Sequence, residues 1–188
     1  RYLDLVMNPE TRARFDLRTQ VVKEMRRYLD DATFVEVETP ILVNKPSGAL
    51  AKPFKSHYNA LHMDCYLRIA PETYLKRLIV GGYERVYEFA RCFRNEGMDP
   101  SHLQDFTMLE YYVAYWSYEE NMQFTEKLVK GLLERVYGSL EAASEATGIR
   151  WEGEWPRVGM GELIERETGI RIQDHPDAPS LLVAITDY

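Results

Sequence analysis

The sequence predicts an α+β fold from three observations. Residues 83–116 have the pattern strand, polar loop, strand, with β-branched and aromatic residues on both sides of the loop. Helix start signals occur near Asn8 and near Ser117, each followed by a long segment with apolar residues at helical spacing. A chain of 188 residues has the size of one domain, which we assign to residues 1–188.

The strand–loop–strand unit carries the candidate functional residues. Arg94 and Glu96 stand where the first strand is expected to end, and His102 lies within the loop. Glu110 lies inside the second strand, which is otherwise largely apolar and aromatic. Charged groups at the ends and on one face of two strands suit a site for a polar, anionic ligand.

The first predicted helix follows Asn8 as a capping residue and Pro9 at the first helical position, and it runs to about Leu29. Its apolar stripe includes Phe15 and continues to Leu29. The opposite face is basic. For this face we favour a solvated surface over a contact with RNA.

Further elements are expected on either side of the central unit. A capping box, Ser117 with Glu120, begins a helix that ends near Gly138 with Met122 and Leu128 directed inward. The remaining predictions are strands at 33–37, 66–70 and, more loosely, 151–158 and 180–188, and helices at 71–80, 140–146 and 161–168.

Composition limits the class of protein. The chain is 45% hydrophobic and 12% aromatic, which is typical of a globular protein, and it has no run of ~18 apolar residues that would span a membrane. Cys65 and Cys92 are isolated, so neither a disulfide framework nor a zinc site is expected. The net charge of −7 argues against nonspecific binding of nucleic acid through overall charge. We therefore expect a cytoplasmic protein without a membrane partner.

Several separated motifs resemble class II aminoacyl-tRNA synthetases, and within that class lysyl-tRNA synthetases. The second signature motif of the class is similar to FRNEG at 93–97, His102 and FTMLEYY at 106–112. The resemblance extends, in family order, through RYLDL at 1–5, VETP at 37–40, LRIAPETYLKRL at 67–78 and VGGYERVYE at 80–88. It implies an antiparallel sheet flanked by helices.

The resemblance assigns an ATP site to the loop and its flanks. Amino-acid activation joins a carboxylate oxygen to the α-phosphorus of ATP, so the site must hold two anions in line. A guanidinium can bridge them, which makes Arg94 the expected catalytic residue. By resemblance Glu96 accepts the adenine amino group, His102 lies near the phosphates and Phe106 stacks on adenine. The alternative for Arg94 and Glu96 is a cross-loop salt bridge of little energetic value.

The resemblance also assigns a lysine site. Glu110 and Tyr112 are two residues apart on a strand, so their side chains share one face and both could contact the ε-ammonium group. By resemblance Glu72 binds the α-amino group, and Gly48 and Ala70 lie against the substrate. From the residues alone, other roles are open. Glu72 could interact favourably with the helix dipole, and Gly48 could be needed only for a positive φ. Glu110 could pair with a core arginine.

The helix, strand and Thr39–Pro40 pair resemble the first motif of the class, which forms the dimer interface in that family, so we expect a homodimer with Pro40 in the interface. Two positions depart from the family pattern. Thr33 replaces a common glycine at the turn between helix and strand, and Leu103 replaces an asparagine after His102. The first departure could alter the turn, and the second removes a side chain that can hydrogen-bond.

The third motif of the class and its magnesium-binding carboxylates are not recognised. VGMGELIER at 158–166 resembles that motif superficially, but its position suits a helix that follows the second motif. We therefore expect a piece of a catalytic domain that is incomplete at the C-terminus and lacks the anticodon-binding domain. Mg²⁺ is expected to support the reaction through ligands outside this chain, so no metal residue is assigned.

The predicted activity is lysine–tRNA ligase: ATP-dependent formation of lysyl-adenylate and transfer of lysine to tRNA(Lys). The isolated chain is expected to be weakly active or inactive. Two alternatives stay open: a paralogue that lysylates elongation factor P, and a non-catalytic synthetase-like dimerisation module. Aspartyl and asparaginyl synthetases share the second motif but need a cationic pocket, whereas Glu72 and Glu110 are acidic.

Overall fold

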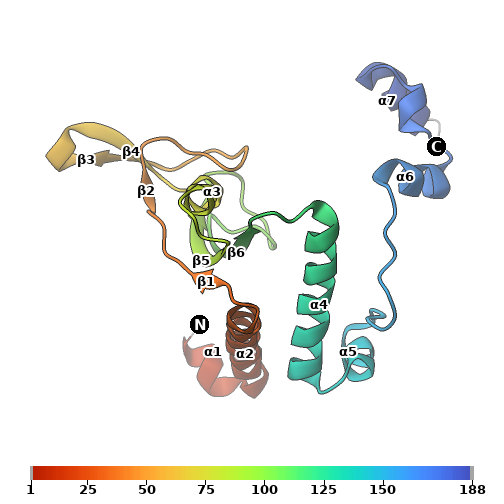
Figure 1. Cartoon of the computed structure of the whole chain (residues 1–188), viewed down its shortest axis with the longest axis horizontal. Helices are drawn as coiled ribbons and strands as arrows, with labels where there is room; N and C mark the ends of the chain where they lie inside the picture. The colour runs from red at the N-terminus through yellow and green to blue at the C-terminus, as the bar shows by residue number, and fades with distance from the viewer. Residues whose placement is uncertain (1, 187–188) are drawn as a thin grey trace.

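The computed structural model describes residues 2–186 and has an α+β architecture with two small sheets (Figure 1). The helices are α1 (Tyr2–Met7), α2 (Pro9–Asp31), α3 (Glu72–Val80), α4 (Tyr118–Tyr137), α5 (Leu140–Thr147), α6 (Met160–Thr168) and α7 (Ala178–Thr186), with short 3₁₀ turns η1 (Asn59–Leu61) and η2 (Ile172–Asp174). The strands are β1 (Val35–Glu36), β2 (Leu42–Val43), β3 (Lys55–Tyr58), β4 (Met63–Leu67), β5 (Arg85–Phe93) and β6 (Asp105–Val113).

The central sheet has the strand order β1–β5–β6. β5 and β6 form the predicted antiparallel pair, with Arg85 opposite Val113 at one end and Phe93 opposite Asp105 at the other. β1 pairs with β5 in parallel, so the sheet is mixed and not wholly antiparallel. Parallel pairing is possible here because the chain makes a long crossover between β1 and β5.

One face of this sheet packs against the two long helices. Leu29 of α2, Tyr87 of β5 and Leu128 of α4 form a buried apolar cluster with Phe34. The Tyr87 hydroxyl donates to Asp30 Oδ1 at 2.9 Å, so the ring is fixed at both its apolar body and its polar end. The other face packs against α3 and leads to the second sheet, with order β2–β4–β3. The face that packs against α2 and α4 therefore forms the core, and the opposite face carries the candidate site.

The start of α2 differs in detail from the prediction. Asn8 is the N-cap residue and Pro9 follows it, but the Asn8 side chain does not cap the helix. Its Nδ2 donates instead to Asp4 Oδ1 at 2.5 Å, because the preceding residues form the unpredicted helix α1. Phe15 is 53% exposed, so the apolar stripe packs against the core through the later turns, where Leu29 is fully buried.

Thr33 lies at the turn between α2 and β1 with a φ of +64°. This left-handed conformation explains why glycine suits the position, since a β-branched residue is strained there. The Arg85 guanidinium contacts the turn through the Ala32 carbonyl and the Thr33 hydroxyl, each at 2.8 Å. The turn is therefore retained in spite of the departure from the family pattern.

We expect Thr33→Gly to raise the free energy of unfolding by about 1 kcal/mol. Strain of ~1–3 kcal/mol is relieved, and part of this gain is offset by the entropy of glycine in the unfolded chain. Urea unfolding measures the change, with Thr33→Ala as the control that removes the hydroxyl and keeps the positive φ. A glycine variant less stable than the alanine variant would contradict this interpretation.

Helix α4 begins as predicted. Ser117 is its N-cap, and the capping box with Glu120 is present. Gly138 ends the helix in the left-handed conformation that glycine adopts without strain. Leu128 is buried as predicted, whereas Met122 is 37% exposed, so its predicted inward position is wrong.

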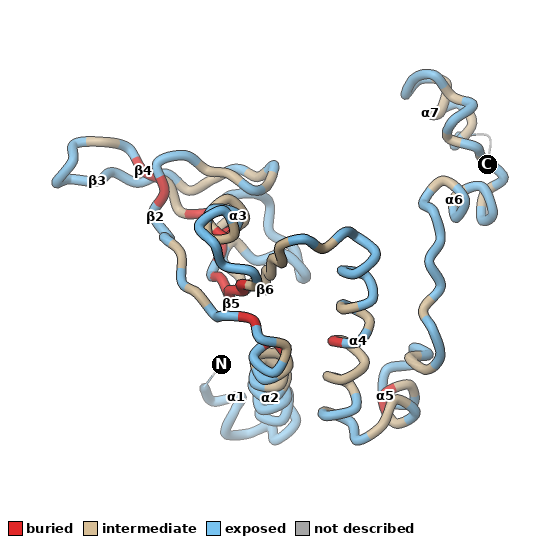
Figure 2. The backbone as a smooth tube through the Cα atoms, in the orientation of Figure 1, coloured by how far each residue is buried: buried red, intermediate tan, exposed pale blue. Residues whose placement is uncertain are grey.

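Two predicted strands are wrong. Residues 151–158 are irregular, and Gly153 and Pro156 interrupt the segment. Residues 180–186 belong to α7, where Asp177 accepts a hydrogen bond from the Ser180 N–H at 2.9 Å; the rest of the run predicted as a strand, 187–188, lies outside the described residues. Figures 1 and 2 show that α6 and α7 extend away from the sheet, and neither has a buried residue.

Candidate active site

The candidate site lies on the face of the central hairpin that is opposite the long helices. Residues paired across two antiparallel strands point to the same face, so the pair Glu88 and Glu110 and the pair Cys92 and Phe106 share it. Arg94 follows β5, and its Cζ lies 5.1 Å from the centre of the Phe106 ring. Arg94 and Glu110 are therefore on one face, and no ion pair joins them among residues 2–186.

A cavity of about 450 Å³ lies at the Arg94 end of this face. It is lined by Arg94, Glu96, Gly97, Ser101, His102, Leu103 and Phe106. The four residues predicted to bind ATP are therefore brought together by the fold. Arg94 Nε is buried and makes no hydrogen bond within the described chain, and a buried donor without a partner requires an explanation. A phosphate or carboxylate oxygen would satisfy it.

Glu96 is in the loop and not on the strand face with Arg94, because β5 ends at Phe93. Its Oε1 accepts a hydrogen bond from the Lys52 N–H at 3.1 Å, and the Asn95 N–H donates to the Lys52 carbonyl at 2.7 Å. The loop is thus tied to the segment before β3. The alternative salt bridge between Arg94 and Glu96 is not formed in the described structure.

His102 is held by a residue that sequence reasoning missed. Asp99 accepts hydrogen bonds from the N–H groups of Ser101 and His102 at 2.8 and 2.9 Å, and its Oδ2 lies 2.7 Å from His102 Nδ1. The Ser101 N–H is the main cause that lowers the pKa of Asp99 to about 2. Aspartate before proline, serine and histidine is a typical turn signal, so the sequence did contain a sign of this contact.

The acidic residues meet farther along the same face. The Tyr112 hydroxyl donates to Glu110 Oε2 at 3.1 Å, as expected for residues that share a strand face. Glu72 of α3 pairs with Lys76, whose Nζ is 2.5 Å from Glu72 Oε1 and 5.9 Å from the centre of the Tyr112 ring. Burial raises the pKa of Glu110, and the nearby Glu72 and Glu88 carboxylates add to this rise. A cationic group bound here would remove that penalty.

Gly48 is brought against the lysine-site candidates Ala70 and Glu72. Its φ is +89°, and a Cβ atom at this position would lie 3.0 Å from the Cβ atoms of both residues. The Thr73 hydroxyl donates to Ser47 Oγ at 2.9 Å and fixes the loop to α3. Glycine is therefore needed for conformation and for space, whether or not its backbone also contacts a substrate.

We expect Gly48→Ala to lower the free energy of unfolding by ~1–3 kcal/mol because the positive φ and the close contacts both oppose a Cβ atom. The matched control is Gly82→Ala, where φ is +103° and no atom lies within 4 Å of the added Cβ. Thermal unfolding measures both changes. Equal losses in the two variants would show that crowding against Ala70 and Glu72 has no effect.

A buried ion pair lies beside the acidic residues and was not predicted. Arg68 Nη1 donates to Glu88 Oε1 at 2.6 Å, and each side chain is 5% exposed. Burial of a charged residue carries no signal in a single sequence, since arginine and glutamate are usually exposed. The alternative partner considered for Glu110, a core arginine, is therefore taken by Glu88.

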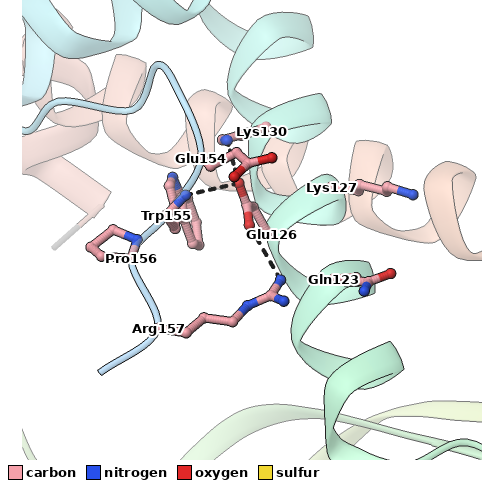
Figure 3. A pocket seen from close by; sticks show the side chains of 8 residues that line it. All are labelled: Gln123, Glu126, Lys127, Lys130, Glu154, Trp155, Pro156 and Arg157. Atoms are coloured by element: carbon pink, nitrogen blue, oxygen red, sulfur yellow. Dashed lines mark hydrogen bonds and ion pairs between the residues drawn. The ribbon is translucent and has the colours of Figure 1, made fainter. Parts of the chain in front are cut away.

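A second cavity, of about 680 Å³, lies between α4 and residues 154–157 (Figure 3). Its central carboxylate, Glu126, accepts hydrogen bonds from Lys130 Nζ and the Trp155 N–H and pairs with Arg157 at 3.7 Å. Figure 3 shows these contacts between the helix and the irregular segment. The charge of Glu126 is therefore balanced by side chains of the chain itself, which indicates that this carboxylate joins α4 to the irregular segment.

No cluster of three His, Cys, Asp or Glu side chains within residues 2–186 is arranged to hold a metal ion, so these residues do not fit a magnesium site. No described helix combines the length and apolar character needed to cross a membrane.

The sequence was compared with known proteins. The family described as "tRNA synthetases class II (D, K and N)" matches residues 1–181. A "Lysine--tRNA ligase" of Carboxydothermus hydrogenoformans is 50% identical over 170 residues, which cover 90% of this chain and 35% of that protein. Proteins with the same description from Coxiella burnetii (48% over 164 residues) and Syntrophomonas wolfei (50% over 170 residues) are covered to 33% and 34% of their length.

The chain thus spans about a third of the length of the curated relatives it matches. The family match covers nearly all of the chain and includes the hairpin, the loop and α3. The chain belongs to the class II tRNA synthetases of the D, K and N group.

Proposed function

We propose that this chain forms part of a lysine–tRNA ligase and contributes the ATP-binding loop and much of the lysine site. The observation that carries the proposal is one sheet face with a buried, unpartnered Arg94 nitrogen at one end and acidic Glu110 and Glu72 farther along. The similarity to lysine–tRNA ligases at 48–50% identity supports the same activity.

In this proposal ATP binds the cavity of about 450 Å³ with adenine stacked on Phe106 and its amino group near Glu96. His102, fixed by Asp99, lies at the phosphate side. The carboxylate oxygen of lysine attacks the α-phosphorus, and pyrophosphate leaves. Arg94 stabilises the charge that the α-phosphate and the incoming carboxylate bring together, because its planar group donates to two oxygens at once.

The acidic pocket supports lysine as the amino acid. Glu110 and Tyr112 would bind the ε-ammonium group, and Glu72 would bind the α-amino group beside Gly48 and Ala70. Aspartate or asparagine would place a carboxylate or an amide against Glu110, and a buried like charge or an unpaired polar group is unfavourable. Charge thus separates lysine from the other two amino acids of the family.

The remaining partners follow from the same proposal. The product lysyl-adenylate would transfer lysine to tRNA(Lys) in the cytoplasm, and Mg²⁺ would be held by residues outside this chain. A homodimer would form through α2, β1 and Pro40. Exposed apolar side chains in this region, Phe15, Val35 and Ile41 among them, support such an interface.

Calorimetric titration of the 188-residue chain with amino acids tests the proposal. We expect lysine to bind and aspartate and asparagine not to bind, and binding of aspartate in place of lysine would overturn the proposal. Lysine-dependent exchange of pyrophosphate into ATP tests the activation step and is expected to be weak for this chain. Offering tRNA(Lys) or elongation factor P as acceptor separates the ligase from the paralogue.

A further inference from the structure

The strand register brings two carboxylates together on the site face. Glu88 of β5 is directly opposite Glu110 of β6. Side chains at such positions have Cβ atoms ~4.5–5.5 Å apart, and like charges there repel each other. One ammonium group can balance the charge of only one of these two carboxylates. If Glu110 binds the ammonium group, the charge of Glu88 must be balanced by another group.

Arg68, at the end of β4, balances that charge. Its Nη1 donates to Glu88 Oε1 at 2.6 Å, and the Thr39 hydroxyl donates to Glu88 Oε2 at 2.6 Å. Both oxygens of Glu88 therefore have donors. Arg68 is itself fixed, since its Nε donates to the Arg91 carbonyl at 2.8 Å and its Nη1 also contacts Thr39.

We propose that Arg68 is a positioning residue of the lysine site: it pairs with Glu88 and occupies that carboxylate, so that Glu110, directly opposite, is the carboxylate that binds the ligand ammonium group. This inference rests on the proposed function. Without Arg68, the unpaired charge of Glu88 directly opposite Glu110 would favour protonation of Glu110, which would then lose the charge that binds lysine.

The other groups around Glu110 do not replace Arg68. Lys76 of α3 is 59% exposed at its side chain and already pairs with Glu72. Tyr112 donates a hydrogen bond to Glu110 but carries no positive charge. Charged or titratable groups that face Glu110 come from α3 (Glu72, Lys76), β5 (Glu88, Cys92) and β6 (Tyr112), with Arg94 beyond the end of β5. Among them Glu88 is the acid that directly opposes Glu110, and Arg68 is its partner.

Three variants of the 188-residue chain test the proposal: Arg68→Met, Glu88→Gln and the double variant. Carbon-detected NMR follows the titration of the Glu110 carboxyl group, which is assigned by its loss in Glu110→Gln. We expect Arg68→Met to raise the titration midpoint by about one pH unit and to weaken lysine binding by up to about tenfold at pH values below the Glu110 midpoint of the unmodified chain. The double variant should restore both values, because it removes both charges.

A purely structural role for Arg68 would not move the Glu110 titration in this pattern. An unchanged midpoint in Arg68→Met, or a double variant that stays as impaired as Arg68→Met, would overturn the proposal. If Arg68→Met does not fold, the comparison of Glu88→Gln with the double variant tests the proposal. Glu88→Gln keeps the positive charge of Arg68 without its carboxylate partner, so the titration midpoint of Glu110 in this variant must lie below the midpoint in the double variant. Equal midpoints would overturn the role of Arg68. Failure of the unmodified chain to bind lysine would instead overturn the proposed function.

Discussion

Replacing Arg94 by alanine is expected to lower the rate of lysyl-adenylate formation by about 10²–10³-fold, as removal of a single charge-stabilising donor does in other enzymes. The buried Nε without a partner is the structural basis, because an unpaired donor in the cavity is placed to bind an anionic oxygen. Arg94→Lys should recover little of this loss, since an ammonium group cannot donate two parallel hydrogen bonds. Lysine-dependent pyrophosphate exchange measures the rate, and ATP titration measures the accompanying loss of affinity.

The matched control is Arg91→Ala. Arg91 lies on β5, three residues before Arg94, but its side chain lies on the other face of the sheet and pairs with Asp105 at 3.3 Å. Its substitution should leave exchange nearly unchanged, because an exposed ion pair contributes little. An Arg91 variant as impaired as the Arg94 variant would show that general loss of positive charge, and not the guanidinium in the cavity, limits the reaction.

Glu110→Gln is expected to weaken lysine binding by about 100-fold or more. The substitution keeps the size of the side chain and removes the charge, and a charged hydrogen bond in a half-buried pocket is worth ~1.5–3 kcal/mol before the cost of the unpaired ammonium is added. Tyr112→Phe should have a smaller effect because it removes one hydrogen bond and no charge. Calorimetry measures both affinities.

Glu134→Gln serves as the control for Glu110, because Glu134 is exposed on α4, away from the site face. It removes the same charge from the chain. Equal losses of lysine affinity in the two glutamine variants would mean that net charge, and not the pocket, attracts lysine.

Features with local signals were predictable from the sequence. The hairpin was expected because aromatic and β-branched runs flank a polar loop, and the structure confirms β5 and β6. Ser117, Glu120 and Gly138 fixed the ends of α4 through hydrogen bonds within a few residues of one another. Strand alternation likewise placed Glu110 and Tyr112 on one face.

Features that depend on distant contacts were not predictable. The run 180–186 has apolar residues that suit a strand or a helix equally, and periodicity does not separate the two in a short segment. Arg68 and Glu88 are charged residues within apolar motifs, and their burial follows from the contacts of Arg68 with the Arg91 carbonyl and with Glu88, and from Thr39. The position of Glu96 follows from the Lys52 backbone, which is far from it in sequence.

The pH dependence of lysine binding tests the central claim most directly. Burial raises the pKa of Glu110 above its ordinary value of 4.5, so in the free chain this carboxyl group binds a proton at a higher pH than an ordinary glutamate does. An ammonium ligand favours the ionised carboxylate, and binding must then displace that proton. The raised pKa has the opposite effect on the stability of the free chain. It stabilises the folded state at pH values below the ordinary pKa of glutamate, and this stabilisation is lost as pH rises through the raised pKa.

Calorimetric titration of the chain with lysine, at pH values above and below the raised pKa of Glu110, measures this dependence. Affinity is predicted to be constant at higher pH and to fall about tenfold per pH unit below the raised pKa of Glu110. The number of protons released to the buffer for each lysine bound should decrease as pH rises. Glu110→Gln should abolish this dependence. A lysine affinity that is the same on both sides of the Glu110 titration would contradict an ammonium site at this carboxylate.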